Sequence, residues 1–594
     1  MMRATKRRLR LSRVLLRLRR LVRNDQLILS VLALVVGAAV GGAVIAFREA
    51  VALVQGVFYG SDAERLSIHA QDLAWWHVVL APAAGGLLIG LFVRYVMPDR
   101  RPHGVADAIE ANALRGGRMS AATGLKAALV NAASIGVGAS VGREGPAVHL
   151  GAALGGWLAE RLHLTRSLSR TLLGCGVAAA VAASFNAPIA GALFASEVVL
   201  GHYALNAFAP IVIASVTATA VSRVYFGDFP AFEIADHAIT SFWEFPSFVV
   251  LGILAGVTAI VFMQGIMLAA SAAEKSLLPV WLRPAAAGLM VGGIAVVFPH
   301  VLGVGYGATE AALGLAFPLG FILAVGVAKI VATAISLGFG FGGGVFSPSL
   351  VVGAMLGGAY GLVIGDMFPA VSLAAGAYTV VGMGAMAAAV LGAPISTALV
   401  IFEMTGGYGI TLAVMVAVVV SSVITRRFHG GSYFAWQLER RGLDLKGGFE
   451  SALLRAIPVA DVMSRDSVRV SIDAHLPDIR ARLQESPTGT LFVVRHDNTF
   501  YGTIALADLS EAAFDHVADD LINASDVARP HPLALTATDD LHAALALMRS
   551  SGEQHVAVVA DHEGAAFLGC IHERDVMNAY NKALVQTRRE ERGD

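Results

Sequence analysis

The stretch that decides the fold reads Gly142-Arg143-Glu144-Gly145-Pro146, and its two charged residues stand alone in a long apolar tract. Between Lys126 and Glu160 no other Arg, Lys, Asp or Glu occurs. The same frame returns without charges as Gly344-Val345-Phe346-Ser347-Pro348. An ionisable residue inside a membrane is costly and marks a functional site by default, so we expect a site at Glu144. The repeated helix break indicates a transport site near the middle of a membrane.

The Gly-x-x-x-Pro frame predicts that a helix begins inside the membrane at each copy, because proline fits the first helical turn and glycine frees the loop before it. The first amides of a helix lack intrahelical partners and favour an anion. Two such ends would form an anion site without a full positive charge. Glu144 could occupy that site itself, which makes it a gate, a proton carrier or both. The alternative is a fixed pair with Arg143.

Composition places these breaks in a membrane domain. Of 594 residues, 56% are hydrophobic and 15% charged, whereas soluble domains carry roughly 25% charged residues. Apolar runs long enough to span recur from residue 26 to about 425, whereas other runs are short and interrupted by glycine. We therefore predict an all-α polytopic domain with broken, re-entrant helices. The long runs include Gln26–Phe47, Trp75–Met97, Phe248–Leu268 and Tyr408–Thr425, and the short ones Gly151–Leu162 and Gly353–Gly365.

The predicted membrane domain consists of two related halves. One block of identities recurs at an offset of 202 residues and a second at 206 residues, in the same order. A site between two such halves is typical of transporters built from repeats. The first block pairs Gly142, Pro146, Gly151, Ala152, Leu154, Gly155 and Gly156 with Gly344, Pro348, Gly353, Ala354, Leu356, Gly357 and Gly358. The second pairs Gly176, Ala187, Pro188, Ile189, Ala192, Leu193 and Glu197 with Gly382, Ala393, Pro394, Ile395, Ala398, Leu399 and Glu403.

The start of the chain is strongly basic, although its formal net charge is zero. Residues 1–24 contain ten Lys or Arg and no acidic residue, and the first spanning run follows at once. We interpret residues 1–25 as a cytoplasmic segment that obeys the positive-inside rule, rather than as a nucleic-acid-binding or transit segment. We thus expect a multi-pass protein of the inner (plasma) membrane with both termini cytoplasmic. The two cysteines, Cys175 and Cys570, support neither a disulfide framework nor a metal site.

The composition changes after Thr425, and residues 456–582 alternate short β-rich runs with amphipathic helices. This part contains its own repeat, because Tyr501–Leu509 matches Leu568–Val576. It resembles a tandem pair of CBS domains at residues 457–515 and 523–582. The resemblance implies that Asp508 or Asp575 contacts the ribose of an adenine nucleotide. The alternative is that the pair binds no ligand and serves dimer assembly.

The two Gly-Pro frames and Tyr433 together resemble the signature of the CLC chloride channel and transporter family, and the likeness runs over residues 26–582. It implies that residues 26–430 form the anion-conducting domain of a homodimer with one pore per subunit. Glu144 would be the gate, with Gly142, Arg143 and Gly145 around it. The amides of Val345 and Phe346 and the hydroxyl of Tyr433 would bind the central anion. The alternative for Tyr433 is an aromatic residue at the membrane interface.

Two departures from the family pattern bear on selectivity and coupling. The family's first anion-binding motif usually reads Gly-Ser-Gly-Ile-Pro, whereas the best match here is 102–106, in which His103 replaces the serine. His103 would donate to the anion or be a solvated loop residue. Proton-coupled members often carry a second glutamate at the position of Val198. Valine favours a channel, while Glu197 and Glu403 are interpreted as structural groups that cap or join helices.

We therefore expect a voltage- or pH-gated chloride channel, with chloride as its ion and membrane lipid as its surroundings. The alternatives are a chloride/proton antiporter and a carrier of another anion such as nitrate or fluoride. An enzyme is not expected, because no paired nucleophile and base and no metal cluster was recognised in the membrane part. The fold needs no cofactor, and nucleic acid is not an expected partner.

Overall fold

The computed structural model describes residues 25–60, 66–228, 244–314, 316–368, 375–443, 454–455, 457–486, 489–509, 519–530, 533–561 and 565–592. The chain forms two compact units, Met1–Leu443 and Asp444–Asp594, which are described separately below. The basic segment predicted at residues 1–25 lies almost wholly outside the described residues.

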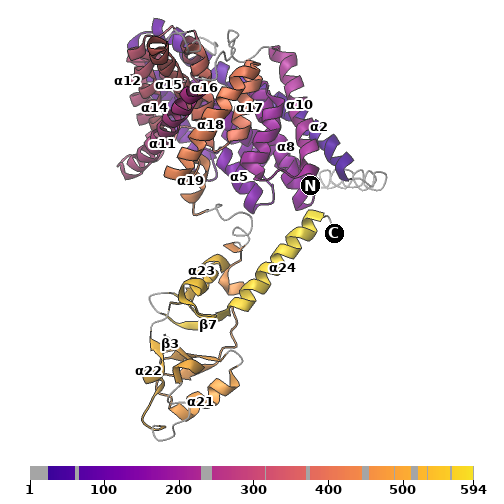
Figure 1. The fold of residues 1–594 in the computed structure, drawn as a ribbon, viewed down its shortest axis with the longest axis vertical. Coiled ribbons are helices and arrows are strands. Elements are labelled where there is room, and N and C mark those ends of the chain that lie inside the picture. The colour runs from indigo at the N-terminus through magenta and orange to yellow at the C-terminus, as the bar shows by residue number, and fades with distance from the viewer. Residues whose placement is uncertain are drawn as a thin grey trace. The chain divides into compact units, whose positions relative to one another are not determined.

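The first unit is helical throughout its described residues (Figure 1). Eight of its described helices are long and apolar enough to cross a membrane. This confirms the predicted polytopic helical domain. The helices are α2 (Asp25–Tyr59), α3 (Leu66–His69), α4 (Trp75–Val96), α5 (Val105–Leu114), α6 (Ala121–Gly136), α7 (Glu144–Arg161), α8 (Arg166–Phe185), α9 (Pro188–Phe194), α10 (Leu205–Phe226), α11 (Phe245–Lys275), α12 (Arg283–Val297), α13 (Tyr306–Leu313), α14 (Leu319–Gly338), α15 (Phe346–Met367), α16 (Ala375–Leu391), α17 (Pro394–Thr405), α18 (Tyr408–Phe428) and α19 (Tyr433–Glu439), with short helical turns at Ala70–Asp72, Ala195–Leu200 and Pro299–Val301.

The broken helices are longer than the sequence indicated. We expected short helices at Gly151–Leu162 and Gly353–Gly365, but these runs are the later parts of α7 and α15. The break therefore falls before Glu144 and before Phe346, where the Gly-Pro frames stand. The glycines inside α7 and α15 do not interrupt their helices, and several of them, among them Gly151 and Gly353, lie where a neighbouring backbone comes close.

Glycine pairs join the same helices in each half. A Cβ on Gly151 of α7 would lie 2.2 Å from the carbonyl oxygen of Gly176 on α8. A Cβ on Gly353 of α15 would lie 2.4 Å from the carbonyl oxygen of Gly382 on α16. Small residues at helix contacts let backbones approach closely in lipid. The two sequence repeats thus build the same helix crossing twice.

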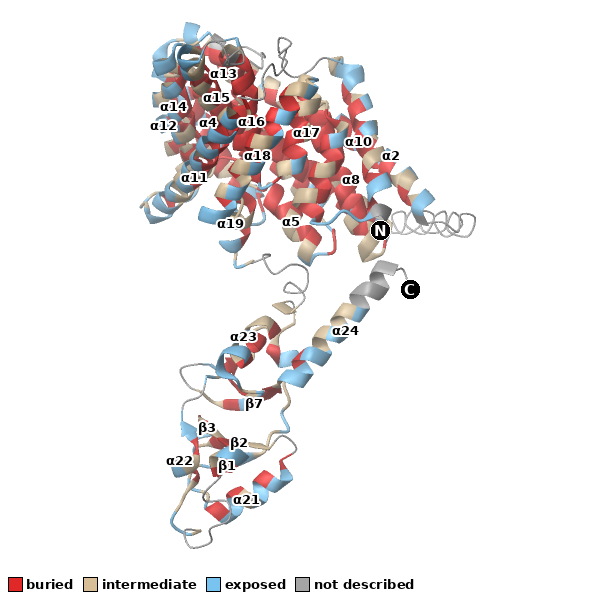
Figure 2. Ribbon diagram, in the orientation of Figure 1, coloured by how far each residue is buried: buried red, intermediate tan, exposed pale blue. Residues whose placement is uncertain are grey.

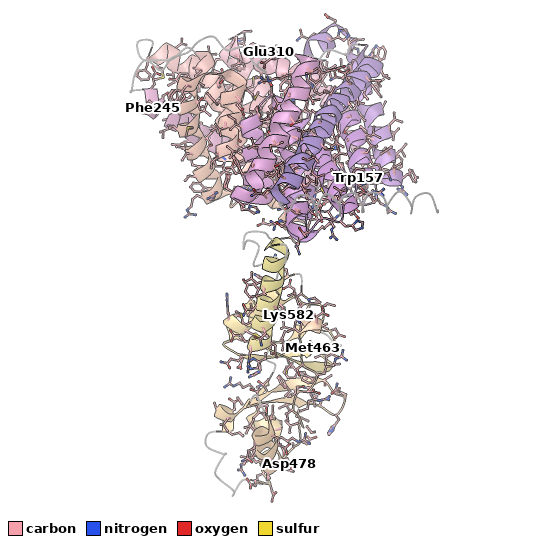
Figure 3. All side chains as sticks on the ribbon, turned by 90° about the vertical axis from the view of Figure 1, so that its right-hand side faces the viewer. Trp157, Phe245, Glu310, Met463, Asp478 and Lys582 are labelled. Carbon is pink, nitrogen blue, oxygen red and sulfur yellow. The ribbon has the colours of Figure 1, made fainter. Side chains whose placement is uncertain are left out.

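Buried residues concentrate in the middle of the first unit (Figure 2). In the most apolar stretch of α8, 83% of the residues are buried, against 39% for α2 and α11, so α8 lies in the interior. Leucine and valine side chains on α2 and α4 are exposed, which suits a lipid-facing surface. Trp157 on α7 and Phe245 at the start of α11 lie at opposite sides of this unit (Figure 3).

The second unit contains two small mixed sheets. Their strand orders are β1-β2-β3-β4 and β5-β6-β7, and β1–β2 and β5–β6 pair in parallel, whereas the other pairs are antiparallel. Its elements confirm the expected alternation of strands and helices. They are β1 (Arg469–Ser471), α21 (Leu476–Glu485), β2 (Thr490–Val494), β3 (Phe500–Ala505), α22 (Ala524–Val527), β4 (Arg529–Pro530), β5 (Leu535–Thr536), α23 (Leu541–Ser551), β6 (His555–Val559), β7 (Phe567–His572) and α24 (Glu573–Arg592), with 3-10 turns at Val459–Asp461 and Leu506–Leu509.

The two repeats of the second unit exchange their opening segments. Val459, from the start of the first repeat, is fully buried in the hydrophobic core of the second repeat. In return, β4 of the second repeat pairs with β3 of the first. Met463, Asp478 and Lys582 lie on separate parts of this unit (Figure 3). The exchange makes the pair one folding unit rather than two independent modules.

Candidate anion site

The two glycine loops, 202 residues apart in the chain, are hydrogen-bonded to each other. The N–H of Gly142 donates to the carbonyl of Gly344 at 2.7 Å, and the N–H of Gly344 donates back at 2.8 Å. The residue before each helix has the same backbone, with φ/ψ of −91°/−19° at Arg143 and −92°/−11° at Val345. The starts of α7 and α15 therefore meet at one place, as the repeat predicted, and each brings unpaired amides to it.

Glu144, the first residue of α7, is only 2% exposed. One carboxylate oxygen accepts a hydrogen bond from the hydroxyl of Ser347, and the other accepts one from the hydroxyl of Tyr306 at 3.0 Å. The Arg143 side chain comes to 3.7 Å from the latter oxygen. The alternative of a pair with Arg143 is thus present as a longer contact, whereas hydroxyl donors make the short ones. Hydrogen bonds to a carboxylate are stronger than those between neutral groups.

A cavity of about 420 Å³ opens at the meeting point of the two helices. It brings together six of the residues predicted for the site. Gly142 and Arg143 are not among the described residues that line it, and the guanidinium of Arg143 lies over the Tyr306 ring at 4.9 Å. The six lining residues are His103, Glu144, Gly145, Val345, Phe346 and Tyr433.

Tyr433 begins α19 and is 6% exposed. Its hydroxyl accepts a hydrogen bond from Gln437 at 3.0 Å, which leaves the phenolic hydrogen free to point elsewhere. A buried tyrosine that lines the cavity does not fit the alternative of an aromatic residue in the interfacial belt. Tyr433 thus lines the same cavity as Val345 and Phe346 at the start of α15.

His103 is buried rather than solvated, at 8% exposed, so the alternative of a solvated loop residue is wrong. Its Nε2 lies 3.2 Å from the carboxylate of Asp99, and its ring packs edge-on against His149 at 5.4 Å between centroids. Beside it, the carboxylate of Asp107 accepts hydrogen bonds from Arg101 at 2.6 Å and from Arg441 at 3.1 Å. This end of the cavity is thus rich in charged groups whose signs balance.

Glu197 and Glu403 cap helices reciprocally across the two halves. The carboxylate of Glu197 accepts hydrogen bonds from the amides of Ile395 and Ser396 at the start of α17, at 3.1 and 2.8 Å. Glu403 accepts from Ile189 and Ala190 at the start of α9, at 3.0 and 2.7 Å. The structural interpretation of both glutamates is confirmed, since a carboxylate satisfies the unpaired amides of a helix start.

In the second unit, Asp508 is engaged within the protein. Its carboxylate accepts hydrogen bonds from the Ala505 amide and from Arg529, both at 2.8 Å. Arg529 also donates to Glu553 of the second repeat at 2.9 Å. A nucleotide ribose would have to displace Arg529 to reach Asp508. Asp575, the equivalent residue, lies in the first turn of α24.

The sequence did not point to Tyr306 or Ser347 as partners of Glu144. Ser347 could have been found, because it stands inside the second Gly-Pro frame, in register with Gly145. Tyr306 carries no such signal. It comes from a separate helix, α13, and only folding brings it to the carboxylate.

Comparisons with known proteins agree with this geometry. A sequence model of the voltage-gated chloride channel family matches residues 85–426, and one of the CBS domain matches residues 459–515 and 524–582. A ClcB-like protein of Ralstonia nicotianae is 36% identical over 409 residues, which cover 68% of this chain and 95% of that protein. The voltage-gated ClC-type chloride channel ClcB of Escherichia coli is 32% identical over 411 residues, or 68% of this chain and 97% of that protein.

Among solved structures, a slow cyanobacterial Cl⁻/H⁺ antiporter has a TM-score of 0.63 at 24% identity, and the match covers 70% of this chain and 98% of that one. At that identity the likeness concerns the fold.

Proposed function

Because the chain belongs to the voltage-gated chloride channel family, the CLC family, we propose that it is a voltage- or pH-gated chloride channel whose gate is Glu144. The observation that carries the proposal is the position of the Glu144 carboxylate. It lies between the starts of two helices from two halves of the chain, beside a cavity lined by Val345, Phe346 and Tyr433. A carboxylate there takes the place of the anion.

The physical mechanism rests on partial charges. The first amides of α7 and α15 offer N–H donors and the positive ends of two helix dipoles. Such donors replace part of the hydration shell of chloride without holding the ion as tightly as a full positive charge would. An anion in the cavity is thus bound weakly enough to leave, and flux is fast when the gate is open.

Glu144 closes the path because its negative charge competes for the same donors. Protonation removes that charge and weakens the hydrogen bonds from Ser347 and Tyr306, so the side chain leaves and chloride enters. Acid on the side from which protons reach Glu144 therefore opens the gate. A change of membrane voltage exerts a force on the same carboxylate charge, because that charge lies within the electric field across the membrane.

A chloride/proton antiporter is the second candidate, and one observation supports the channel over it. A second proton carrier is needed to pass protons between Glu144 and the opposite side. Val198, where proton-coupled members often have glutamate, has an apolar side chain packed against the core. The neighbouring carboxylate, Glu197, is committed to the start of α17. This favours uncoupled conduction.

Several further properties belong to the same proposal. The protein lies in the inner (plasma) membrane with both termini cytoplasmic and assembles as a homodimer with one pore per subunit. The CBS pair takes an adenine nucleotide at Asp508 or Asp575. Calorimetry with AMP and ATP on the full chain tests the last point, and Arg529→Gln should strengthen binding at Asp508 because it removes the competing partner.

The experiment that tests conduction is the reversal potential of the reconstituted protein under opposed chloride and proton gradients. A channel gives the chloride equilibrium potential whatever the proton gradient is. A shift of the reversal potential with pH at fixed chloride would support the antiporter instead. Replacing chloride by nitrate or fluoride in the same bilayer measures the selectivity that His103 brings into question.

A further inference from the structure

A second, smaller cavity of about 140 Å³ lies beside the first and contains a group of metal-ligating side chains. One ligand atom from each of His103, Asp107 and His149 lies within 4.8 Å of the other two. The three come from separate places, the loop before α5, α5 itself and α7. Conduction as proposed above makes no use of His149.

The histidines of this group have unsatisfied nitrogens. His149 is 1% exposed, and neither of its ring nitrogens has a hydrogen-bond partner in the described part of the chain. The Nε2 of His103 also makes no hydrogen bond of acceptable geometry there, although the Asp99 carboxylate is 3.2 Å away. Buried polar atoms without partners are rare and need an explanation. Two neutral imidazoles and a carboxylate are a common ligand set of a transition metal, with one position left open.

We propose that His103, His149 and Asp107 bind a divalent transition-metal ion such as Zn²⁺, and that the bound ion slows anion flux. The proposal that the metal binds does not depend on the proposed function. The effect on flux rests on the proposed function, and it follows because His103 and Asp107 line both cavities. A metal held there places two positive charges at the wall of the anion path, and a chloride ion beside them is held too tightly to move on.

The charges around the group decide how strong the binding is. One oxygen of Asp107 accepts from the Gly104 amide at 2.8 Å and keeps the start of α5 in place. The other oxygen accepts from Arg101 at 2.6 Å and from Arg441 at 3.1 Å, and it is this oxygen that would bind a metal. Arg101 has a second carboxylate, Asp99, at 3.9 Å, and its side chain is 34% exposed. Arg101 can therefore move to Asp99 when a metal binds.

This competition gives a prediction that a structural role of the histidines would not give. Arg101→Gln removes the nearer of the two arginines that compete for Asp107, the other being Arg441, so Zn²⁺ should bind about tenfold more tightly. His149→Gln removes one of three ligands and should weaken binding by about 100-fold. A matched control is His572→Gln in the second unit, where His555 and His572 face each other with ring centroids 4.1 Å apart. That variant should bind Zn²⁺ at the membrane site as the natural chain does.

The experiment is calorimetry with Zn²⁺ on the full chain in detergent, purified without a histidine tag, together with the visible absorption of Co²⁺ in the same site. Size-exclusion profiles and thermal unfolding show whether each variant is folded. Tight binding that His149→Gln removes and His572→Gln keeps is the expected result. Binding unchanged by His149→Gln, or the absence of binding in the natural chain, would overturn the site, and an unchanged affinity of Arg101→Gln would contradict Asp107 as a ligand.

The proposed effect of the metal on anion flux is tested by a separate measurement. Chloride efflux from proteoliposomes should fall when Zn²⁺ is added to the natural chain and should not fall in His149→Gln. Zn²⁺ binding without any change in efflux would contradict the regulation. If neither the natural chain nor Glu144→Gln releases chloride in the absence of metal, that result would contradict the proposed function instead. The two failures are therefore distinguishable.

Discussion

The carboxylate of Glu144 is held by two hydroxyl groups that come from distant parts of the chain. Ser347 stands in the second Gly-Pro frame at the position that Gly145 occupies in the first. The two frames are therefore not copies in function, because one supplies the charge and the other supplies a donor to it. Tyr306 adds a second donor from α13. The proposed gate needs such donors when it is closed, since an unpaired buried carboxylate would not stay charged.

Glu144→Gln should raise the rate of chloride efflux and flatten its pH dependence. Glutamine has nearly the shape of the protonated acid and cannot regain the charge that competes with chloride. Efflux from proteoliposomes over a series of pH values measures both effects. Glu160→Gln, at the other end of α7, is the matched control. Loss of efflux in folded Glu144→Gln protein would contradict the gate.

Tyr306→Phe should favour the open gate at neutral pH. A hydrogen bond to a charged group contributes about 1.5–3 kcal/mol, so removing one should raise the ratio of open to closed channels by about ten- to a hundredfold. Single-channel recording in planar bilayers would measure the change as open probability. Tyr360→Phe is a suitable control, because Tyr360 also donates to an oxygen, that of Ser247, at 3.1 Å. Equal open probabilities in Tyr306→Phe and the natural chain would remove Tyr306 from the gate.

Cys570 is expected to be unreactive in the folded protein. Burial raises the pKa of its thiol to about 11, and the nearby Asp575 carboxylate acts in the same direction. Because only the thiolate reacts, roughly one thiol in a thousand is reactive at pH 8. In a Cys175→Ser background, mass spectrometry should find Cys570 unlabelled by iodoacetamide until denaturant is added. Rapid labelling of the native chain would show that β7 opens readily.

Helix starts were predictable and helix partners were not. The frames around Pro146 and Pro348 locate the starts of α7 and α15 because glycine and proline act within one turn of the chain. The crossings of Gly151 with Gly176 and of Gly353 with Gly382 depend on which helices lie side by side, which is a tertiary matter. The sequence repeat identifies Gly151 with Gly353 and Gly176 with Gly382 as equivalent positions, but it does not indicate which glycines are in contact.

The reciprocal caps of α9 and α17 link the two halves away from the anion site. Glu403→Ala leaves the amides of Ile189 and Ala190 without their acceptor. Caps of this kind contribute about 1 kcal/mol, so the thermal unfolding midpoint in detergent should fall. Glu160→Ala again serves as a control, because Glu160 is exposed at the end of its helix. An unchanged midpoint would mean that water replaces the carboxylate at no cost.

Across the whole chain, the site exists only because two halves meet. Gly142 and Gly344 exchange two hydrogen bonds, so neither half forms the cavity alone. The sequence indicated both halves and the CBS pair, since identities at a fixed offset are a property of the chain itself. It could not indicate the contact of Tyr306 with Glu144, the burial of His103 or the exchanged segments of the second unit. Each of these arises from packing between residues that no spacing relates.

The most informative test of the anion site is a crystal structure of Glu144→Gln grown in bromide, with the anomalous signal of the ion recorded. We expect bromide in the cavity, within hydrogen-bond distance of the Val345 and Phe346 amides and the Tyr433 hydroxyl. In the natural chain, the Glu144 carboxylate should stand in the path beside Ser347. A cavity without bromide in Glu144→Gln, or bromide bound only at the arginines around Asp107, would contradict an anion site made by the two helix starts.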